Sequence, residues 1–250
     1  QTSDIARFSI IIFLASYIDN NYKHMQEFVK GLLIPLLAIF PIAFMIFIQP
    51  DNSTTIILLM ITYILLFVGG ASFIQLATIG VLSAGTFGVF LLNEKNYALG
   101  RILSFIDPSS SASMGYQSNQ ALIGLKQGGW TGMGIGESIQ KYSYLPETHT
   151  DFIFAIIGEE MGFITGSILM LVYYIIFYRA VQISKRSNDI FGIMLSIGFG
   201  LSITIYAFIN IGVVIGIIPV TGVPLPFISY GGSSLIINLM MIAILLNISK

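Results

Sequence analysis

The sequence predicts an all-α polytopic membrane protein, and two observations lead to that prediction: composition and segment length. Apolar residues make up 55% of the 250 positions and charged residues only 9%, and the mean hydropathy is +0.87. A soluble domain of this size displays much more charge on its surface. The net charge of −1 offers no basic surface, so no nucleic-acid partner is expected, and the lack of cysteine excludes disulfides and thiolate metal sites.

Seven apolar segments are expected to form membrane helices. A helix needs roughly 20 residues to cross about 30 Å of hydrocarbon. The runs are continuous rather than alternating, which predicts helices and not barrel strands. The first is short and contains Arg7. The expected helices cover residues 5–18, 32–48, 54–70, 72–92, 152–178, 190–218 and 229–248.

Residues 93–151 form a long polar connection, which is expected to lie outside the cytoplasm. Counting lysines and arginines in the short loops places six on one side of the membrane and only Arg7 on the other. Residues 114–126 within the connection have the pattern of a short amphipathic helix. The glycine-rich loop, residues 128–136, follows no strand, so it predicts turns that fold back over a cavity rather than a dinucleotide site.

A cluster of polar residues stands where this connection enters the next apolar run. Glu147, His149 and Asp151 alternate over five positions. Direct metal ligation by all three is one interpretation, although this spacing in a loop is weak evidence for it. Asp151 is also a candidate N-cap of the following helix. Its third interpretation is a general base at the membrane surface.

Two neighbouring acids, Glu159 and Glu160, follow about 12–14 Å further along the same helix. Adjacent helical residues project about 100° apart, so both cannot face one cavity. A structural role, hydrogen-bonded to neighbouring elements, is favoured over direct chemistry. Similarly, Asn210 and Asn238 are expected to hydrogen-bond between helices, and the glycines of residues 192–200 to permit close helix packing. Prolines at 219, 224 and 226 predict a non-helical segment that lines a cavity.

Two long segments resemble the SEDS (shape, elongation, division and sporulation) proteins. They are residues 144–163, which begin Tyr-Leu-Pro-Glu-Thr-His-Thr-Asp, and residues 218–234, which end Ser-Tyr-Gly-Gly-Ser-Ser. The opening Gln1-Thr-Ser-Asp4 and the element at 48–51 resemble two further family motifs. Residues 140–141 and 157–160 look more like the division branch than the elongation branch. Since family members have ten membrane helices, the resemblance implies a fragment that lacks the first three.

The resemblance implies a peptidoglycan glycosyltransferase that polymerises lipid II, the undecaprenyl-pyrophosphate-linked disaccharide pentapeptide. It places the essential carboxylate on Asp151. It implies a site on the extracytoplasmic face of the bacterial cytoplasmic membrane, at the division septum, and as partners a class B penicillin-binding protein and other division proteins. The substrate-binding residues it implies are Arg101, Lys141, Glu147, His149, Ser229, Tyr230, Gly231, Gly232 and Ser233.

The chemistry of the reaction agrees with a carboxylate at position 151. A β-1,4 link made from an α-linked lipid pyrophosphate inverts C1, so the acceptor hydroxyl attacks directly and a base takes its proton. No cofactor is required by this scheme, but Mg²⁺ or Mn²⁺ bridging Asp151 and the pyrophosphate is a candidate, because such ions are held by one or two carboxylates plus substrate oxygens. The alternatives are a lipid II flippase or small-solute transporter, and a non-catalytic division scaffold.

Overall fold

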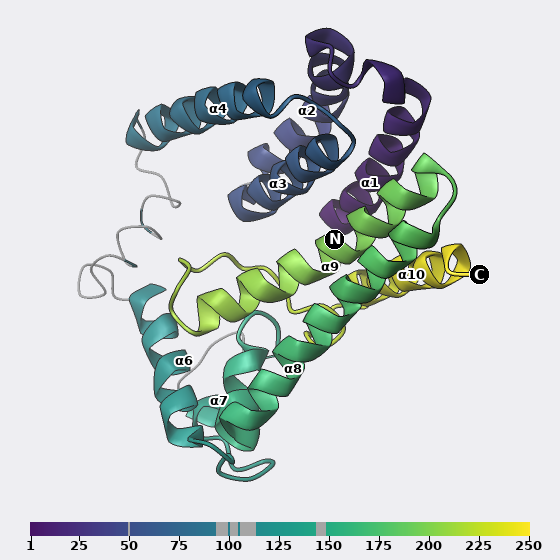
Figure 1. The fold of residues 1–250 in the computed structure, drawn as a ribbon. Coiled ribbons are helices and arrows are strands. Elements are labelled where there is room, and N and C mark those ends of the chain that lie inside the picture. The colour runs from purple at the N-terminus through teal and green to yellow at the C-terminus, as the bar shows by residue number, and fades with distance from the viewer. Residues whose placement is uncertain (50, 94–99, 101–104, 106–113, 144–148) are drawn as a thin grey trace. The chain divides into compact units, whose positions relative to one another are not determined.

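The computed structural model describes residues 1–49, 51–93, 100, 105, 114–143 and 149–250 (Figure 1). Helices account for nearly all of the regular structure in these residues. The chain divides into two compact units. The first contains Gln1–Asn93, Ile176–Ile203 and Ser233–Lys250, and the second contains Glu94–Ile175 and Thr204–Gly232.

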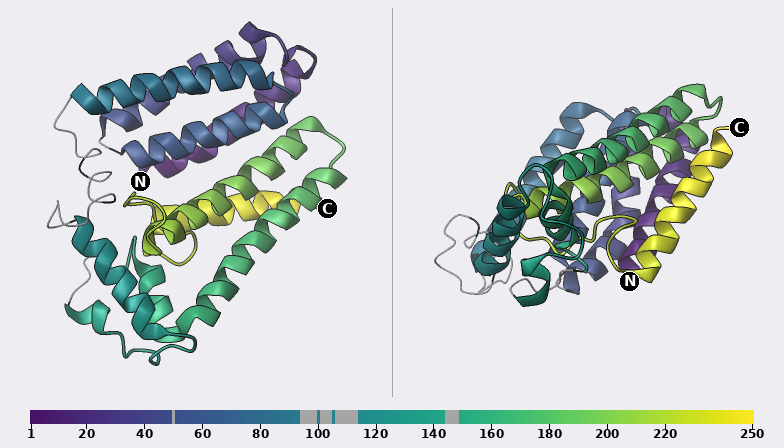
Figure 2. Two further views of the ribbon diagram at one scale, coloured as in Figure 1. Left: turned by 60° about the vertical axis from the view of Figure 1, so that its left-hand side comes forward. Right: turned by 90° about the horizontal axis from the view of Figure 1, so that it is seen from below.

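The N-terminal helices of the first unit pack on one another. They are α1 (Thr2–Asn21), a 3₁₀ turn (Tyr22–His24), a π turn (Val29–Leu33) that leads into α2 (Ile34–Ile48), α3 (Asn52–Val68) and α4 (Phe73–Asn93). Helix α1 contacts α2 and α3, and α3 contacts α4 (Figure 2). The carboxylate of Asp51 caps α3, because it accepts the N–H of Thr54 at 3.1 Å. Leu14 and Leu65 are fully buried in this unit.

The first part of α9 (Ile190–Val214) completes the packing of the first unit. Phe199 of α9 stacks on Phe8 of α1, with ring centroids 5.4 Å apart. A Cβ atom at Gly198 would stand 2.5 Å from Ile11, and one at Gly200 would stand 2.3 Å from the Cβ of Ala180. The expectation of close helix packing is therefore confirmed for Gly198 and Gly200, whereas Gly192 lies against Ser187 and Asp189 of the loop before α9.

Arg7 lies in the apolar helix α1 and is almost completely buried. Its guanidinium donates to Oδ1 of Asn238 in α10 (Gly232–Ile248) at 3.0 Å and lies 3.5 Å from the carboxylate of Asp4. A charge in a membrane helix is costly unless it is paired with other polar groups. These contacts explain how α1 carries an arginine, and they confirm Asn238 as a residue that hydrogen-bonds between helices.

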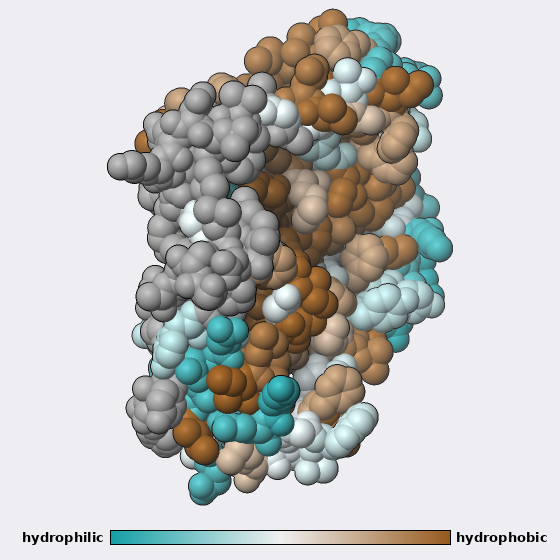
Figure 3. All heavy atoms as spheres, turned by 90° about the vertical axis from the view of Figure 1, so that its left-hand side faces the viewer, coloured by the Kyte–Doolittle hydropathy of each residue, from teal (hydrophilic) through white to brown (hydrophobic). Residues whose placement is uncertain are grey.

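The second unit is built around the N-terminal part of α8 (Ile153–Arg186). Helices α6 (Met114–Gly128) and α7 (Ile139–Ser143) lie beside it (Figure 1). Helix α6 is the helix expected over residues 114–126. Hydrophilic residues gather on the surface over α6 (Figure 3).

Several helices begin or end elsewhere than the sequence predicts. Helix α9 ends at Val214 and not at 218, and Gly216 follows with φ of +73°. Helix α10 begins at Gly232 and not at 229, because residues 218–231 are irregular and contain three prolines that cannot donate a helical hydrogen bond. Helix α8 continues to Arg186, beyond the expected end at 178.

Within the described part of the chain, three helices are long and apolar enough to cross a membrane. They are Val29–Ile48, Ile153–Arg186 and Ile190–Val214. Three further apolar helical stretches are shorter: Asn52–Val68, Gly232–Ile248 and Phe73–Ser83, the first part of α4.

Helix α8 is interrupted at Gly162, where the sequence predicts one continuous helix. Gly162 has φ of +77° and ψ of 179°, a conformation that only glycine adopts without large strain. In an unbroken helix the carbonyls of Glu159 and Glu160 would accept the N–H groups of Phe163 and Ile164, four residues later. The backbone at Gly162 removes both of these bonds, so four backbone polar groups need other partners.

The glycine-rich loop supplies those four partners. The N–H groups of Met133 and Gly134 donate to the carbonyls of Glu159 and Glu160, each at 3.0 Å. The carbonyl of Gly129 accepts from Phe163 at 2.9 Å, and the carbonyl of Trp130 accepts from Ile164 at 3.3 Å. The loop therefore replaces both broken helical bonds group for group, which explains why the break is tolerated. Trp130 also packs edge-on against Phe163, with centroids 5.3 Å apart.

Glycines are needed here because two backbones touch. A Cβ atom at Gly132 would stand 2.2 Å from the carbonyl oxygen of Glu160, and one at Gly128 would stand 2.0 Å from the carbonyl oxygen of Gly158. Neither backbone atom can move away as a side chain could. The expectation that this loop forms turns is confirmed, but its described role is to join the interrupted helix α8.

Candidate active site

Asp151 stands in a turn of residues 149–152, immediately before α8. Three consecutive carbonyls of this turn are held by hydrogen bonds. Tyr230 N–H donates to the carbonyl of His149 at 2.8 Å, Ser229 Oγ donates to that of Thr150, and Asn210 Nδ2 donates to that of Asp151 at 2.7 Å. The peptide groups around Asp151 are therefore fixed on one side by α9 and by the segment before α10.

Asn210 and Ser229 each connect more than one element. The amide nitrogen of Asn210, which is almost fully buried, also donates to the carbonyl of Val223 at 2.7 Å. The hydroxyl of Ser229 also accepts the N–H of Leu225 at 2.8 Å. Asn210 thus has the hydrogen-bonding role expected from the sequence. Ser229 was expected among the substrate-binding residues. Its hydroxyl is engaged with the N–H of Leu225 and the carbonyl of Thr150.

The irregular segment before α10 is held in a strained shape. Phe227 has φ of +67°, which is unusual for a residue other than glycine. The preceding residue, Pro226, accepts a hydrogen bond from the hydroxyl of the buried Tyr173 in α8. The strain is local to the turn that presents Ser229 and Tyr230 to the Asp151 turn, and strained backbone of this kind is often found at functional sites.

Gly222 lies beside the carboxylate of Asp151. A Cβ atom at Gly222 would stand 3.5 Å from Oδ2 of Asp151, and φ at Gly222 is +73°. The carboxylate therefore faces the loop that contains Gly222, in agreement with the expectation that the proline-containing segment lines the site. Asp151 itself is partly buried.

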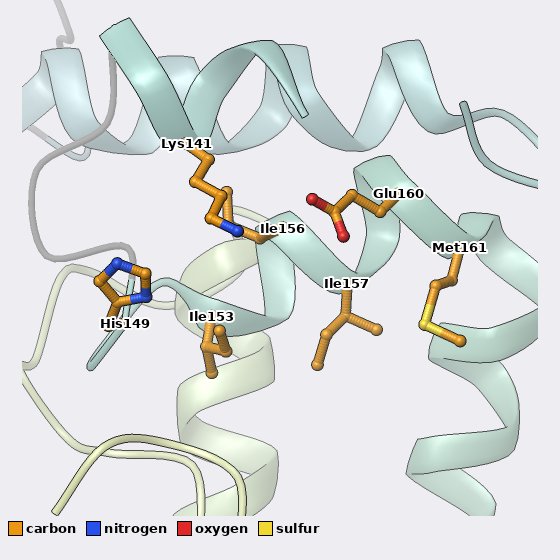
Figure 4. A pocket seen from close by; sticks show the side chains of 7 residues that line it. All are labelled: Lys141, His149, Ile153, Ile156, Ile157, Glu160 and Met161. Atoms are coloured by element: carbon orange, nitrogen blue, oxygen red, sulfur yellow. The ribbon is translucent and has the colours of Figure 1, made fainter. Parts of the chain in front are cut away.

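A cavity of about 160 Å³ lies along the first turns of α8. Its polar lining residues are Lys141, His149 and Glu160, and its apolar ones are Ile153, Ile156, Ile157 and Met161. Lys141 and Glu160 point into it from α7 and α8 (Figure 4). The structure thus brings together two residues expected at the site, Lys141 and His149. Asp151 is two residues from His149 along the chain but is not part of this lining.

The two neighbouring acids of α8 have different surroundings. Glu159 is fully buried and accepts hydrogen bonds from the Ser138 hydroxyl and from the N–H groups of Ile139 and Gln140, the latter two at 3.0 and 3.4 Å. Glu160 lines the cavity instead. The expectation that the pair cannot face one cavity is confirmed, and the structural role expected for the acids is met by Glu159.

The other residues expected at the site either lie outside the described residues or belong to the segment 230–233. Arg101 and Glu147 lie outside the described residues. Tyr230 is 83% exposed and contributes its backbone N–H to the Asp151 turn. Gly231 and Gly232 connect it to α10. Ser233 belongs to the first unit.

Sequence reasoning expected a structural role for the adjacent acids. It missed Ser138 as a partner of Glu159 and the closeness of Gly222 to Asp151, because both depend on contacts between segments far apart in the chain. Among the described residues, no three histidine or acidic side chains are grouped so as to hold a metal ion.

The fold and the site define a polytopic helical membrane protein with a cavity lined by polar and apolar side chains and an aspartate in a hydrogen-bonded turn before one long helix. The family model described as cell cycle protein, FtsW/RodA/SpoVE, matches residues 1–250. The chain therefore belongs to the FtsW/RodA/SpoVE family, which is the SEDS family that its motifs resemble.

Individual relatives agree with this assignment. Stage V sporulation protein E of Bacillus subtilis is 38% identical over all of this chain and 68% of its own length. The probable peptidoglycan glycosyltransferase FtsW of Aliivibrio salmonicida is 34% identical over 99% of this chain and 63% of its own length. A solved chain from a peptidoglycan synthase complex that coordinates polymerization and crosslinking has a TM-score of 0.72 and 25% identity, over all of this chain and 69% of its own. The chain thus spans about two thirds of the length of the proteins it matches.

Proposed function

We propose that this protein is a peptidoglycan glycosyltransferase that polymerises lipid II at a site around Asp151. The observation that carries the proposal is the fixed turn of residues 149–151. Its three carbonyls are all hydrogen-bonded, so the Asp151 side chain extends from a rigid backbone just before α8. The relatives named as probable peptidoglycan glycosyltransferases support the reaction type.

Asp151 acts as the general base in this proposal. The 4-hydroxyl oxygen of the acceptor sugar attacks C1 of the donor sugar and forms the new C–O bond with inversion. The bond from C1 to the pyrophosphate oxygen breaks, and the lipid pyrophosphate leaves with the electron pair. The hydroxyl proton goes to the Asp151 carboxylate. A positioned base contributes on the order of 10²–10⁴-fold to such a step, and a fixed turn maintains the positioning.

The cavity on α8 suits one end of the lipid pyrophosphate. Lys141 and His149 are the groups in its lining that can donate to phosphate oxygens, Glu160 is an acid in the same lining, and the isoleucines and Met161 offer an apolar wall to prenyl carbons. Lysine binds phosphate as a point charge. Arg101, as a planar fork for the pyrophosphate, Glu147 and the segment 229–232 complete the proposed substrate site.

A divalent cation is a candidate component of this site. Asp151 would hold it together with the pyrophosphate of the substrate, since Mg²⁺ is commonly bound by one or two carboxylates plus substrate phosphates. The ion would neutralise charge on the leaving group.

The proposed setting is the extracytoplasmic face of the bacterial cytoplasmic membrane at the division septum. The proposed partner is a class B penicillin-binding protein that crosslinks the new strands. The similarity to a chain of a complex that combines polymerization with crosslinking supports this partnership.

A lipid II flippase is the second candidate, and the interruption of α8 favours it. Transporters commonly bind substrate at broken helices, with polar residues nearby, and Glu159 and Glu160 lie three and two residues before the break at Gly162. The glycine-rich loop, however, occupies the freed backbone groups at the break with four hydrogen bonds, which indicates a structural contact and not a substrate site.

The deciding experiment measures glycan strands made from purified lipid II by the protein and its partner in detergent micelles. Micelles have no two leaflets, so a flippase has no transport to perform, and long strands would support the polymerase. Asp151→Asn should lower the rate by about 10²-fold or more, because an amide cannot take the proton. Asp19→Asn, the same chemical change at an exposed position of α1, should leave the rate unchanged. A folded Asp151→Asn protein that polymerises at the parent rate would remove Asp151 as the base.

A further inference from the structure

Helix α7 is anchored to α8 through one buried carboxylate. Glu159 is 0% exposed, and three donors at the start of α7 converge on it: the Ser138 hydroxyl, Ile139 N–H and Gln140 N–H. The first N–H groups of a helix have no partner within the helix. Glu159 therefore supplies the acceptor that α7 needs, from a different element.

Lys141 is connected to Glu159 through Ser138. Its backbone N–H donates to the Ser138 hydroxyl oxygen at 3.1 Å, and the same hydroxyl donates to Glu159. The chain Lys141, Ser138, Glu159 is thus continuous in hydrogen bonds. The Lys141 side chain points into the cavity that His149 and Glu160 also line (Figure 4).

The same residue of α8 also holds the glycine-rich loop that leads into α7. The carbonyl of Glu159 accepts the N–H of Met133 at 3.0 Å, while its side chain holds the beginning of α7. Gly124 of α6 lies against this carboxylate, where a Cβ atom would stand 3.5 Å from Oε2. Glu159 therefore fixes both ends of the short connection between the loop and Lys141.

We infer that Glu159 is a positioning residue: its carboxylate holds α7 so that Lys141 meets the pyrophosphate of the lipid substrate in the cavity on α8. The inference rests on the proposed function for the identity of the ligand. Glu159 itself does not take part in bond making, because its carboxylate is engaged with α7 and is closed off from solvent.

The test measures binding of undecaprenyl pyrophosphate to the protein in detergent micelles, which requires no turnover. Lys141→Ala should weaken binding by about tenfold or more, the scale of a hydrogen bond to a charged group. Glu159→Ala should weaken it to a similar degree. Glu159→Gln keeps an oxygen that accepts from Ile139 and Gln140, so binding should stay within about threefold of the parent. Glu137→Gln, the same change at an exposed neighbouring position, should have no effect.

The double variant separates positioning from general stabilisation. Once Lys141 is alanine, Glu159→Ala should weaken binding no further, since the group that it positions is gone. An additional loss in the double variant equal to that of Glu159→Ala alone would overturn the inference. So would a Lys141→Ala protein that binds as tightly as the parent.

Ser138→Ala keeps the test decisive if Glu159→Ala does not fold. It removes only one hydroxyl between Glu159 and Lys141, and it should weaken binding in the parent but not in Lys141→Ala. A Glu159→Gln protein that binds normally but makes no strands would assign Glu159 to the chemistry and contradict the positioning role. If the parent binds as expected but makes no strands from lipid II, the proposed function fails while the positioning result stands.

Discussion

Replacing Gly162 by alanine is expected to separate the glycine-rich loop from α8. The new Cβ atom would stand 2.4 Å from the backbone nitrogen of Gly132 and 2.5 Å from the carbonyl oxygen of Trp130. Both are backbone atoms, so no side chain can rotate away to make room. The φ of +77° at this position adds strain for any residue with a Cβ atom.

The size of the effect follows from what the contact contains. Four hydrogen bonds join the loop to α8, each with a net contribution of about 0.5–1.5 kcal/mol. Backbone strain at such a position costs about 1–3 kcal/mol. Loss of the four hydrogen bonds, together with the added strain, therefore lowers the free energy of unfolding by roughly 3–9 kcal/mol.

Gly166→Ala in the same helix is the matched control. A Cβ atom there would meet only the tip of the Phe154 ring, at 3.3 Å, and alanine is favoured over glycine inside a helix by about 1 kcal/mol. The change in stability should thus stay within about 1 kcal/mol.

Unfolding of the purified protein by SDS in mixed micelles measures both variants, and trypsin cleavage after Lys126 or Lys141 reports release of the loop. We expect Gly162→Ala to unfold at lower SDS and to be cleaved faster than the parent. The reasoning is refuted if Gly162→Ala matches Gly166→Ala in both measurements.

Three further results are expected. Asn210→Leu keeps the branching at Cγ but removes the amide that donates to the carbonyls of Asp151 and Val223, at about 1–3 kcal/mol each, so stability and lipid II polymerisation should both fall; a variant with parent stability would contradict the role of this amide. Phe227→Gly should be more stable than Phe227→Ala by about 1 kcal/mol in the same unfolding assay, because only glycine adopts a positive φ without strain; equal stability would argue against strain. The pKa of Asp189 is lowered, chiefly because its carboxylate accepts the Gly192 N–H and also a serine hydroxyl. Its contribution to folding stability is therefore present above the unfolded pKa of about 3.9 and is lost as pH falls through the lower folded pKa. Asp189→Asn should remove this acid dependence from thermal unfolding.

Much of the fold follows from local sequence, because membrane helices depend on length and hydropathy. The continuous apolar runs predicted helices, and the structure has a helix in each of those regions. Helix ends were less predictable. The irregular stretch before α10 was visible in its prolines, yet its extent to residue 231 is set by hydrogen bonds to the Asp151 turn.

The break at Gly162 could not be read from the sequence. Glycine within an apolar helix usually permits close packing, as Gly198 does against Ile11. Whether it interrupts the helix instead depends on a second segment that can satisfy the freed backbone groups. Here that segment lies about 30 residues earlier in the chain, beyond the reach of any helical or strand period.

The membrane class, the family, and Asp151, Lys141 and His149 as candidates could be read from the residues alone, because composition and motif spacing are properties of the chain. How those candidates are held depends on the packing of distant segments. Asn210 and Ser229 fix the turn of Asp151, and Glu159 holds α7 rather than facing the cavity. The direction in which an acid points depends on which donors another element brings to it, and that is settled only when the helices pack.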